Sequence, residues 1–173
     1  LENGEPCYFV DESLKDYSTS FIQEYTLVEI LQLAAHMSAG VLYQRRDGVF
    51  YVGPRGMILS DYVIDQNISY AHPEFEISKP LKAVSVTYGE DKSAVVTVGT
   101  TGEVQTVNNG FVLTQSDALR VGQATANVLN NRKTISGEFR ADPRLDPLDV
   151  VRVHSKYAEN NVVITDIEFS TTG

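Results

Sequence analysis

Three aspartates, Asp142, Asp146 and Asp149, cluster in one short segment, and carboxylates so grouped are candidate ligands for a cation. A calcium loop supplies about six to eight oxygens, commonly from alternating acidic residues around a glycine. The spacing here lacks that alternation, and Pro143 and Pro147 interrupt the segment. Aspartate before proline typically begins a turn by bonding its own backbone. The pattern therefore favours a structural corner, with an adventitious cation site as the alternative.

The histidines and the single cysteine do not form a metal-binding pattern. His36, His72 and His154 lie far apart, and none of them has the spacing of a local zinc motif. A lone cysteine, Cys7, excludes an intramolecular disulfide and a cysteine-cluster metal site. No base lies beside it to activate the thiol. We predict that the chain has no metal, no cofactor and no catalytic residues.

No sequence signature of a known enzyme class is present. The chain has no nucleophile elbow, phosphate-binding loop or dinucleotide fingerprint, and Gly99-Thr100-Thr101-Gly102 lies between strand patterns rather than before a helix. A glycosidase needs a pair of carboxylates, but the acidic residues are scattered and there is no tryptophan to stack on a sugar. The sequence predicts that the protein is not an enzyme.

Charge and hydropathy exclude two further classes. The 173-residue chain has a formal net charge of −9, which opposes binding to a phosphate backbone. No apolar run approaches the ~18 residues of a membrane helix, so no membrane insertion is expected. The nine tyrosines fit either a protein interface or simple strand propensity.

The first part of the chain predicts a helix followed by a hairpin. Thr26 and Glu29 have the spacing of a capping box, and apolar residues recur at helical spacing over 27–38. Gly40 is expected to end this helix in a left-handed conformation. The hairpin spans 41–52, with Asp47 and Gly48 as a turn in which both residues need positive φ.

The second part predicts strands, one helix and further strands. His72 to Pro80 is a proline-bracketed connector, and alternation predicts a half-buried strand over 82–88. Thr114 caps a helix over 115–130, with Asp117 at the capping-box position. Gly122 allows this helix to lie close to a sheet. Strands are also expected at 94–98, 102–107, 150–153 and 162–169.

These elements predict an α+β fold of mostly antiparallel strands. Residues 1–80 are expected to form a small subdomain with the helix and hairpin. Residues 81–173 are expected to form a β-rich subdomain, a barrel or a sandwich, with one packed helix. The first residue, Leu1, and the end directly after a strand suggest a piece of a longer polypeptide.

Two segments resemble phage tail-tip and baseplate-hub proteins. The family's C-terminal β-module has the typical form dP-x-L-x-x-G-D-x-V-x-V, which Asp142-Pro143-Arg144-Leu145 and Asp149-Val150-Val151-Arg152-Val153 fit. Leu148 replaces the usual glycine, which predicts a different turn there. LQLAAHMSAGVLYQRRDGVFYV is similar to the helix and hairpin of the family's small α+β subdomain.

The resemblance implies a structural module of a phage or prophage tail, in the hub, tip or baseplate. Such modules form rings of identical copies, contact other tail proteins and perform no chemistry. The implied location is the virion tail, or the bacterial cytoplasm when the protein is expressed from a prophage. The alternative is a carbohydrate- or surface-binding β-module of a fibre or cell-surface protein. A ring-forming module would have apolar lateral surfaces, whereas a glycan binder would have a concave groove lined by tyrosines.

Overall fold

The computed structural model divides the chain into two compact units, each built from two segments. It describes residues 8–15, 17, 25–45, 48–55, 58–79, 83–100, 103–131, 133–140, 142–154 and 159–170. Unit 1 contains Leu1–Pro54 and Lys79–Asn131, and unit 2 contains Arg55–Ser78 and Arg132–Gly173. The chain passes from one unit to the other near residues 54, 78 and 131. The sequence suggested a single boundary between subdomains, near His72–Pro80. The boundaries near residues 54 and 131 were not expected.

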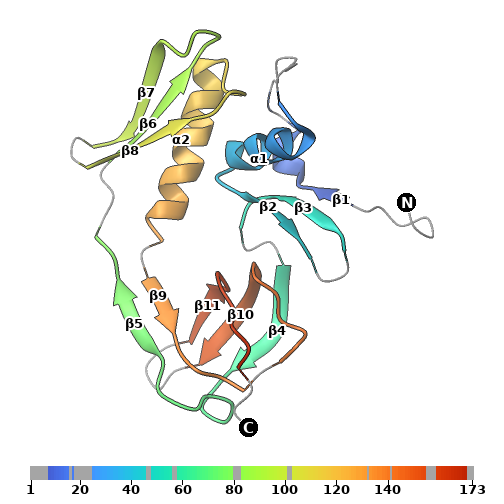
Figure 1. Ribbon diagram of the computed structural model, residues 1–173. Helices are drawn as coiled ribbons and strands as arrows, with labels where there is room; N and C mark the ends of the chain where they lie inside the picture. The colour runs from blue at the N-terminus through green and yellow to red at the C-terminus, as the bar shows by residue number, and fades with distance from the viewer. Residues whose placement is uncertain are drawn as a thin grey trace. The chain divides into compact units, whose positions relative to one another are not determined.

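Unit 1 contains two three-stranded sheets and both long helices of the described chain (Figure 1). One sheet has the order β1-β3-β2 and lies against helix α1, Leu27–Met37. The other has the order β7-β6-β8 and lies against helix α2, Gln115–Leu129. A short 3₁₀ helix covers Glu12–Leu14. The strands are β1 Tyr8–Val10, β2 Val41–Gln44, β3 Phe50–Gly53, β6 Ala83–Tyr88, β7 Ala94–Gly99 and β8 Val104–Asn108.

Helix α1 begins at the capping box and ends one residue earlier than expected. The Thr26 amide donates to Glu29 Oε2 at 2.8 Å, and the Glu29 amide donates to Thr26 Oγ1 at 3.3 Å. The Thr26 hydroxyl also donates to Glu29 Oε2 at 2.8 Å, and the bonds from the Thr26 amide and hydroxyl to this carboxylate lower the pKa of Glu29. At the other end, the Ala39 amide donates to His36 O and the Gly40 amide to Ala35 O. This pair of bonds is a Schellman motif.

The left-handed residue of that motif is Ala39, with φ of 53°, and not Gly40 as the sequence suggested. Gly40 is needed for a different reason. A Cβ atom at this position would lie 1.9 Å from the carbonyl oxygen of Gly53. Gly40 therefore allows the end of α1 to approach strand β3, which no side chain would permit.

The hairpin after α1 has a longer loop than the sequence suggested. Strands β2 and β3 pair antiparallel from Val41↔Gly53 to Gln44↔Phe50. The Arg45 amide donates to Val49 O, and the Gly48 amide donates to Arg45 O. The last bonded pair before the turn is therefore Arg45 with Val49, and Gly48 takes the positive φ of 82° that such a turn favours. Asp47 lies outside the described residues.

Helix α2 packs directly on β6 and β7. A Cβ atom added to Gly122 would lie 2.8 Å from a methyl of Val98 and 3.3 Å from a methyl of Val86. The glycine thus lets the helix lie close to the sheet, as predicted. Thr114 Oγ1 accepts from the Asp117 amide at 3.1 Å and donates to Asp117 Oδ2 at 2.8 Å. The core of unit 1 contains Met37, Val84, Val86, Val96, Phe111, Val112, Ala118 and Val121.

The two halves of unit 1 share this core. Buried Asn109 donates to the Leu33 carbonyl of α1 at 2.8 Å, and its own side-chain oxygen accepts from the Phe111 amide at 2.9 Å. Lys92 donates to the carbonyls of Gly110 and Val112. Burial lowers the pKa of Lys92. These bonds hold the segment before α2 and explain why residues 79–131 join α1 in one unit.

Unit 2 contains a three-stranded sheet and a separate two-stranded ribbon. The sheet has the order β11-β10-β4, with β4 Ile58–Ile64, β10 Asp149–His154 and β11 Glu159–Val163. The last strand begins three residues before, and ends six residues before, the 162–169 that the sequence suggested. The ribbon pairs β5, Glu74–Ile77, with β9, Lys133–Ser136. The core consists of Ile64, Val151 and Val153, with Tyr62, Ile68, Phe139, Leu145, Val162 and Ile164 packed around them.

The fold is α+β, as predicted, and of the barrel or sandwich expected for residues 81–173, a closed barrel does not occur among the described strands. The described strands form four small open sheets, and none closes on itself. The three-stranded sheets are mixed, because each contains one parallel pair: β1 with β3, β6 with β8, and β4 with β10. Neither helix of the described chain is long and apolar enough to cross a bilayer.

Candidate assembly surfaces

The β5–β9 ribbon is the most exposed regular structure in unit 2. The two strands pair antiparallel in the register Glu74↔Ser136, Phe75↔Ile135, Glu76↔Thr134 and Ile77↔Lys133. All four residues of β5 are exposed, as are three of the four in β9. An isolated two-stranded ribbon is marginally stable in water. Its exposure in this unit therefore marks it as a candidate contact surface.

The ribbon has one apolar face and one polar face. Side chains alternate along a strand, so Phe75, Ile77 and Ile135 share a face, with Lys133 at its end opposite Ile77. Phe75 is 54% exposed and Ile77 64%. Glu74 and Glu76 lie on the opposite face, beside Thr134 and Ser136 in the register. Scattered exposed apolar residues are ordinary, but a face of three on one ribbon is typical of a surface that contacts a partner.

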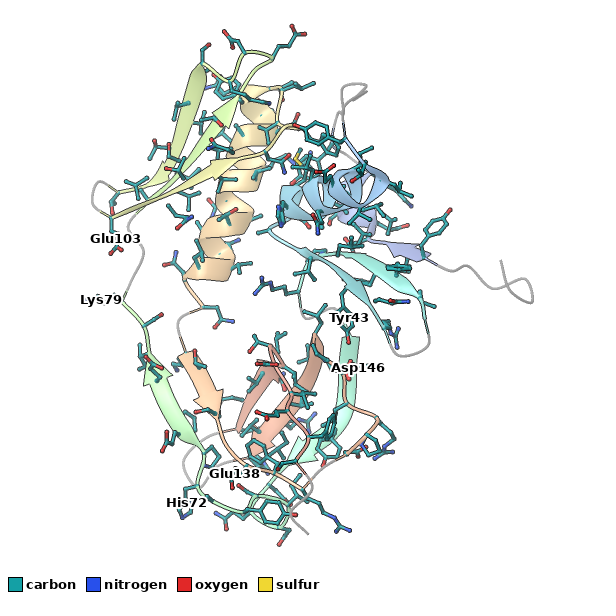
Figure 2. All side chains as sticks on the ribbon, viewed as in Figure 1. Tyr43, His72, Lys79, Glu103, Glu138 and Asp146 are labelled. Atoms are coloured by element: carbon teal, nitrogen blue, oxygen red, sulfur yellow. The ribbon has the colours of Figure 1, made fainter. Side chains whose placement is uncertain are left out.

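One end of the ribbon is fixed to the core of unit 2. The Tyr70 amide donates to Glu138 O at 2.9 Å, and the Arg140 amide donates to Ile68 O at 2.7 Å. Between these bonds lies a bridge from Ser69 to Phe139, whose ring packs on the core. Figure 2 labels His72 and Glu138 at this end. The ribbon is therefore held at its base.

A second exposed apolar surface lies in unit 1 at strand β1, the edge of its sheet. Tyr8 is 61% exposed and Phe9 51%. Phe9 stacks on Tyr51, with ring centroids 5.6 Å apart and planes 6° from parallel. Tyr51 is itself buried and donates to Pro54 O at 2.9 Å. Burial, and then the nearby Asp11 carboxylate, raise the pKa of Tyr51 from 10.0 to about 12.

The predicted aspartate corner consists of two consecutive turns. In the first, Asp142 O accepts from the Leu145 amide at 3.2 Å, and Asp142 Oδ1 accepts from the Arg144 amide at 2.9 Å. The Arg144 side chain also binds the Asp142 carboxylate, at 2.7 Å from Nη2 to Oδ2. This contact raises the pKa of Arg144. Pro143 lies within the turn, where its fixed φ is favourable.

In the second turn, Asp146 O accepts from the Asp149 amide at 3.2 Å, and Asp149 Oδ2 accepts from the Asp146 amide at 3.0 Å. Pro147 precedes Leu148, whose φ is 78°. Proline followed by a residue with φ near +80° is typical of a type II turn, which favours glycine at the second position. Leu148 thus has a backbone conformation that glycine adopts at lower cost, and the different turn that the sequence suggested stays a prediction.

The corner aspartates make these bonds to the chain itself, which agrees with a structural reading. Among the described residues, no three histidine, cysteine, aspartate or glutamate side chains are placed to hold a metal ion. His36 is exposed in the last turn of α1. Cys7 lies outside the described residues.

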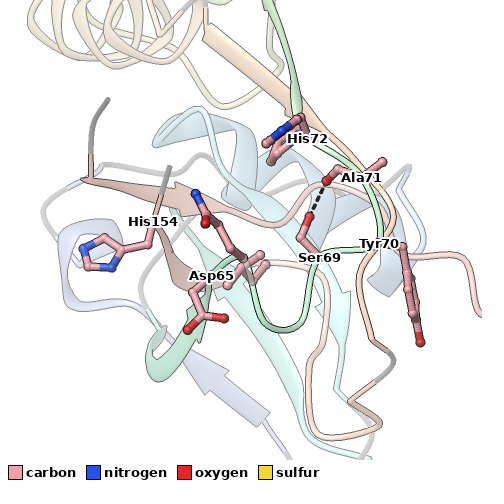
Figure 3. A pocket seen from close by; sticks show the side chains of 9 residues that line it. Asp65, Ser69, Tyr70, Ala71, His72 and His154 are labelled. Atoms are coloured by element: carbon pink, nitrogen blue, oxygen red, sulfur yellow. Dashed lines mark hydrogen bonds between the residues drawn. The ribbon is translucent and has the colours of Figure 1, made fainter. Parts of the chain in front are cut away.

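A shallow pocket in unit 2 has a volume of about 250 Å³ and lies between the start of β5 and the end of β10 (Figure 3). His154 contacts Glu159 at 3.0 Å, and Asp65 accepts from the amide and side chain of Asn67. Of the tyrosines that the structure describes, Tyr70 lines it, and its side chain is exposed. Asp65 and His154 are engaged in these local contacts, and the described lining is not the row of tyrosines expected of a glycan-binding groove.

Sequence reasoning found the caps and the corner but missed the ribbon. The sequence indicated residues 72–80 only as a connector, and no strand was expected at 133–136. The alternation of Glu74-Phe75-Glu76-Ile77 is a period-2 signal that predicts a half-buried strand. Its partner was not detectable, because the second segment of unit 1, Lys79–Asn131, lies between the paired strands in the sequence.

No protein-family model and no curated protein matches this sequence. Solved structures with a similar fold do exist. A chain from the virion of a native gene transfer agent particle is similar with a TM-score of 0.61 and 20% identity, over 79% of this chain and 35% of that chain. The 43 kDa tail protein of prophage MuSo2 from Shewanella oneidensis is similar with a TM-score of 0.56 and 14% identity, over 94% of this chain and 56% of that chain.

The chain therefore spans between about a third and about half of the length of these solved proteins. At such low identity the similarity concerns the fold. This chain has a fold that also occurs in a component of a virion and in a prophage tail protein.

Proposed function

We propose that this chain is a structural module of a phage or prophage tail, in the hub, tip or baseplate. The observation that carries the proposal is the fold, which is similar over most of this chain to a virion component and to a prophage tail protein. Two segments of the sequence, the helix with its hairpin and the aspartate corner, resemble the same class of protein independently.

The module acts through protein–protein contacts rather than chemistry. The apolar face of the β5–β9 ribbon and the exposed aromatic residues of β1 supply candidate contact surfaces. Its partners are other tail proteins and further copies of itself in a ring. A ring interface is heterologous, because one patch of each subunit meets a different patch of its neighbour. The net charge of −9 disfavours contact with packaged nucleic acid.

Particle fractionation tests this proposal. Prophage particles from the source strain are induced, purified and separated into tails and heads, and peptides are identified in each fraction by mass spectrometry. We expect peptides of this chain in intact particles and in the tail fraction. Its absence from purified particles, or its recovery only with heads, contradicts the proposal.

Loss of the gene provides a second observation. Deletion is expected to leave filled heads without functional tails, and a plasmid copy should restore infectious or transferring particles. A deletion strain that makes normal tails indicates that the chain has another role.

A further inference from the structure

We propose that the β5–β9 ribbon extends from one copy of the chain to the next, with strand β5 of one copy pairing antiparallel with the outer edge of β9 in its neighbour. The inference rests on the proposed function for its biological setting. The pairing itself is argued from the strands and is tested separately.

Within the part of the chain that the structure describes, no further strand pairs with either outer edge of the ribbon. Strand β5 pairs only with β9 among the described residues, and β9 only with β5. Open edges present a row of amide and carbonyl groups that pair readily with another strand. Soluble proteins usually protect such edges by keeping the strands short, or with prolines, bulges and charged side chains, especially lysine. Strands β5 and β9 are short, and β9 carries Lys133. Neither four-residue strand contains a proline, and their register is regular.

The register within one copy can be repeated between copies. In an antiparallel pair, opposite residues either both bond across the pair or both direct their backbone groups outward. The outward positions of β5 and β9 therefore correspond. A second copy can repeat Phe75↔Ile135 and Ile77↔Lys133 with the same alternation of faces. The apolar residues of successive copies then lie on one continuous face.

Charge selects this arrangement over pairing between two β5 strands. Strand β5 carries Glu74 and Glu76, whereas β9 carries Lys133. Two antiparallel β5 strands with Phe75 opposite its own copy would place Glu74 opposite Glu76, and like charges directly opposite are destabilising. A neighbour's β9 instead places Thr134 and Ser136, which carry no charge, opposite these carboxylates, and Lys133 lies opposite Ile77 on the other face.

A contact of four residues per strand is too small for a tight complex alone, because stable interfaces bury about 1,200–2,000 Å². The isolated chain should therefore associate weakly. A ring multiplies the contact, because each copy uses β5 toward one neighbour and β9 toward the other. Heterologous pairing also leaves no ribbon edge open in a closed ring.

Directed thiol cross-linking of the full chain tests the pairing. Two variants, Glu76→Cys and Thr134→Cys, are made with Cys7→Ser in both, and each retains one thiol. They are oxidised separately and as an equal mixture at high micromolar concentration, and dimers are resolved on non-reducing gels. We expect the mixture to form a mixed disulfide about tenfold faster than either variant alone, because the register holds the two thiols together.

A mixture of Thr97→Cys, on strand β7, with Thr134→Cys measures the rate of random collision, and circular dichroism checks that every variant folds. Cross-linking of the test mixture no faster than this control overturns the proposal. If Thr134→Cys alone cross-links faster than the mixture, two β9 strands meet around a two-fold axis. If Glu76→Cys alone cross-links faster than the mixture, two β5 strands meet in the same way. Either result also overturns the proposed pairing of β5 with β9. If particle fractionation finds the chain in tails but the mixed disulfide does not form faster than the control, the pairing is refuted and the proposed function still stands.

Discussion

Replacement of Leu148 tests the geometry of the aspartate corner. This residue has φ of 78° after Pro147, in a turn that favours glycine. Its amide donates to Ile164 O at 2.8 Å, so the strained residue is also fixed to the segment after β11. We expect the Leu148→Gly variant to be more stable than Leu148→Ala. Both changes remove the same half-buried side chain, and only glycine relieves the backbone.

The magnitude follows from two opposing contributions. A left-handed conformation costs a residue with a Cβ atom about 1–2 kcal/mol. The glycine variant is free of this cost. Part of that advantage is lost, because glycine also gives the unfolded chain more conformational freedom, worth about 0.4–1 kcal/mol. The Gly variant should therefore exceed the Ala variant by about 1 kcal/mol in the free energy of unfolding.

Urea unfolding, followed by circular dichroism, measures this difference. With a slope of about 1–3 kcal/mol per molar urea, the two midpoints should differ by roughly 0.3–1 M. The matched control is Arg152, an exposed residue of β10. There the order should reverse, with Arg152→Ala about 0.5–1 kcal/mol more stable than Arg152→Gly. An alanine variant at 148 as stable as the glycine variant, or more stable, refutes the turn geometry.

Three further predictions concern the caps, a buried tyrosine and the same corner. Ala39→Gly should stabilise the protein by about 0.5–1 kcal/mol, because Ala39 has φ of 53°. Gly40→Ala should destabilise it by more than ~2 kcal/mol, because the new Cβ would lie 1.9 Å from Gly53 O; thermal melts of both variants check the opposite signs. The pKa of Tyr51 rises on folding from 10.0 to about 12, so the stability from its protonated form is complete below pH 10 and is lost as the pH rises toward 12. Melting temperatures measured over that range should fall less steeply for Tyr51→Phe, and equal slopes contradict the shift. Asp149→Ala should lose ~1–2 kcal/mol, because the Asp146 amide loses its acceptor. Calcium should not restore that loss, and a calcium-dependent rise in the melting temperature of the unchanged protein would favour a cation site.

Local chemistry made several elements predictable from the sequence. The Thr26–Glu29 capping box and the Thr114 cap are set by residues three positions apart. The helices therefore lie within one residue of their predicted ends. The alternation of strand β6 likewise predicted which face carries Val84 and Val86, both of which are buried. In each case the signal and the structure that it specifies lie within the same few residues.

Long-range pairing was not predictable in this way. The ribbon joins Phe75 to Ile135, and the parallel pair of β4 with β10 joins Ile58 to Asp149. No local pattern encodes such partners, so the two-segment composition of each unit and the absence of a barrel were missed. The positions with a left-handed backbone were not predicted for another reason. Ala39 and Leu148 adopt positive φ without being glycine, because hydrogen bonds on both sides of each residue hold the backbone there.

A density map of intact particles, obtained by electron cryomicroscopy, tests the central proposal most directly. We expect repeated copies of this fold around the tail axis at its distal end, with β5 of one copy beside β9 of the next. A tail map that accounts for every density at the hub, tip and baseplate without this fold would contradict the proposed function.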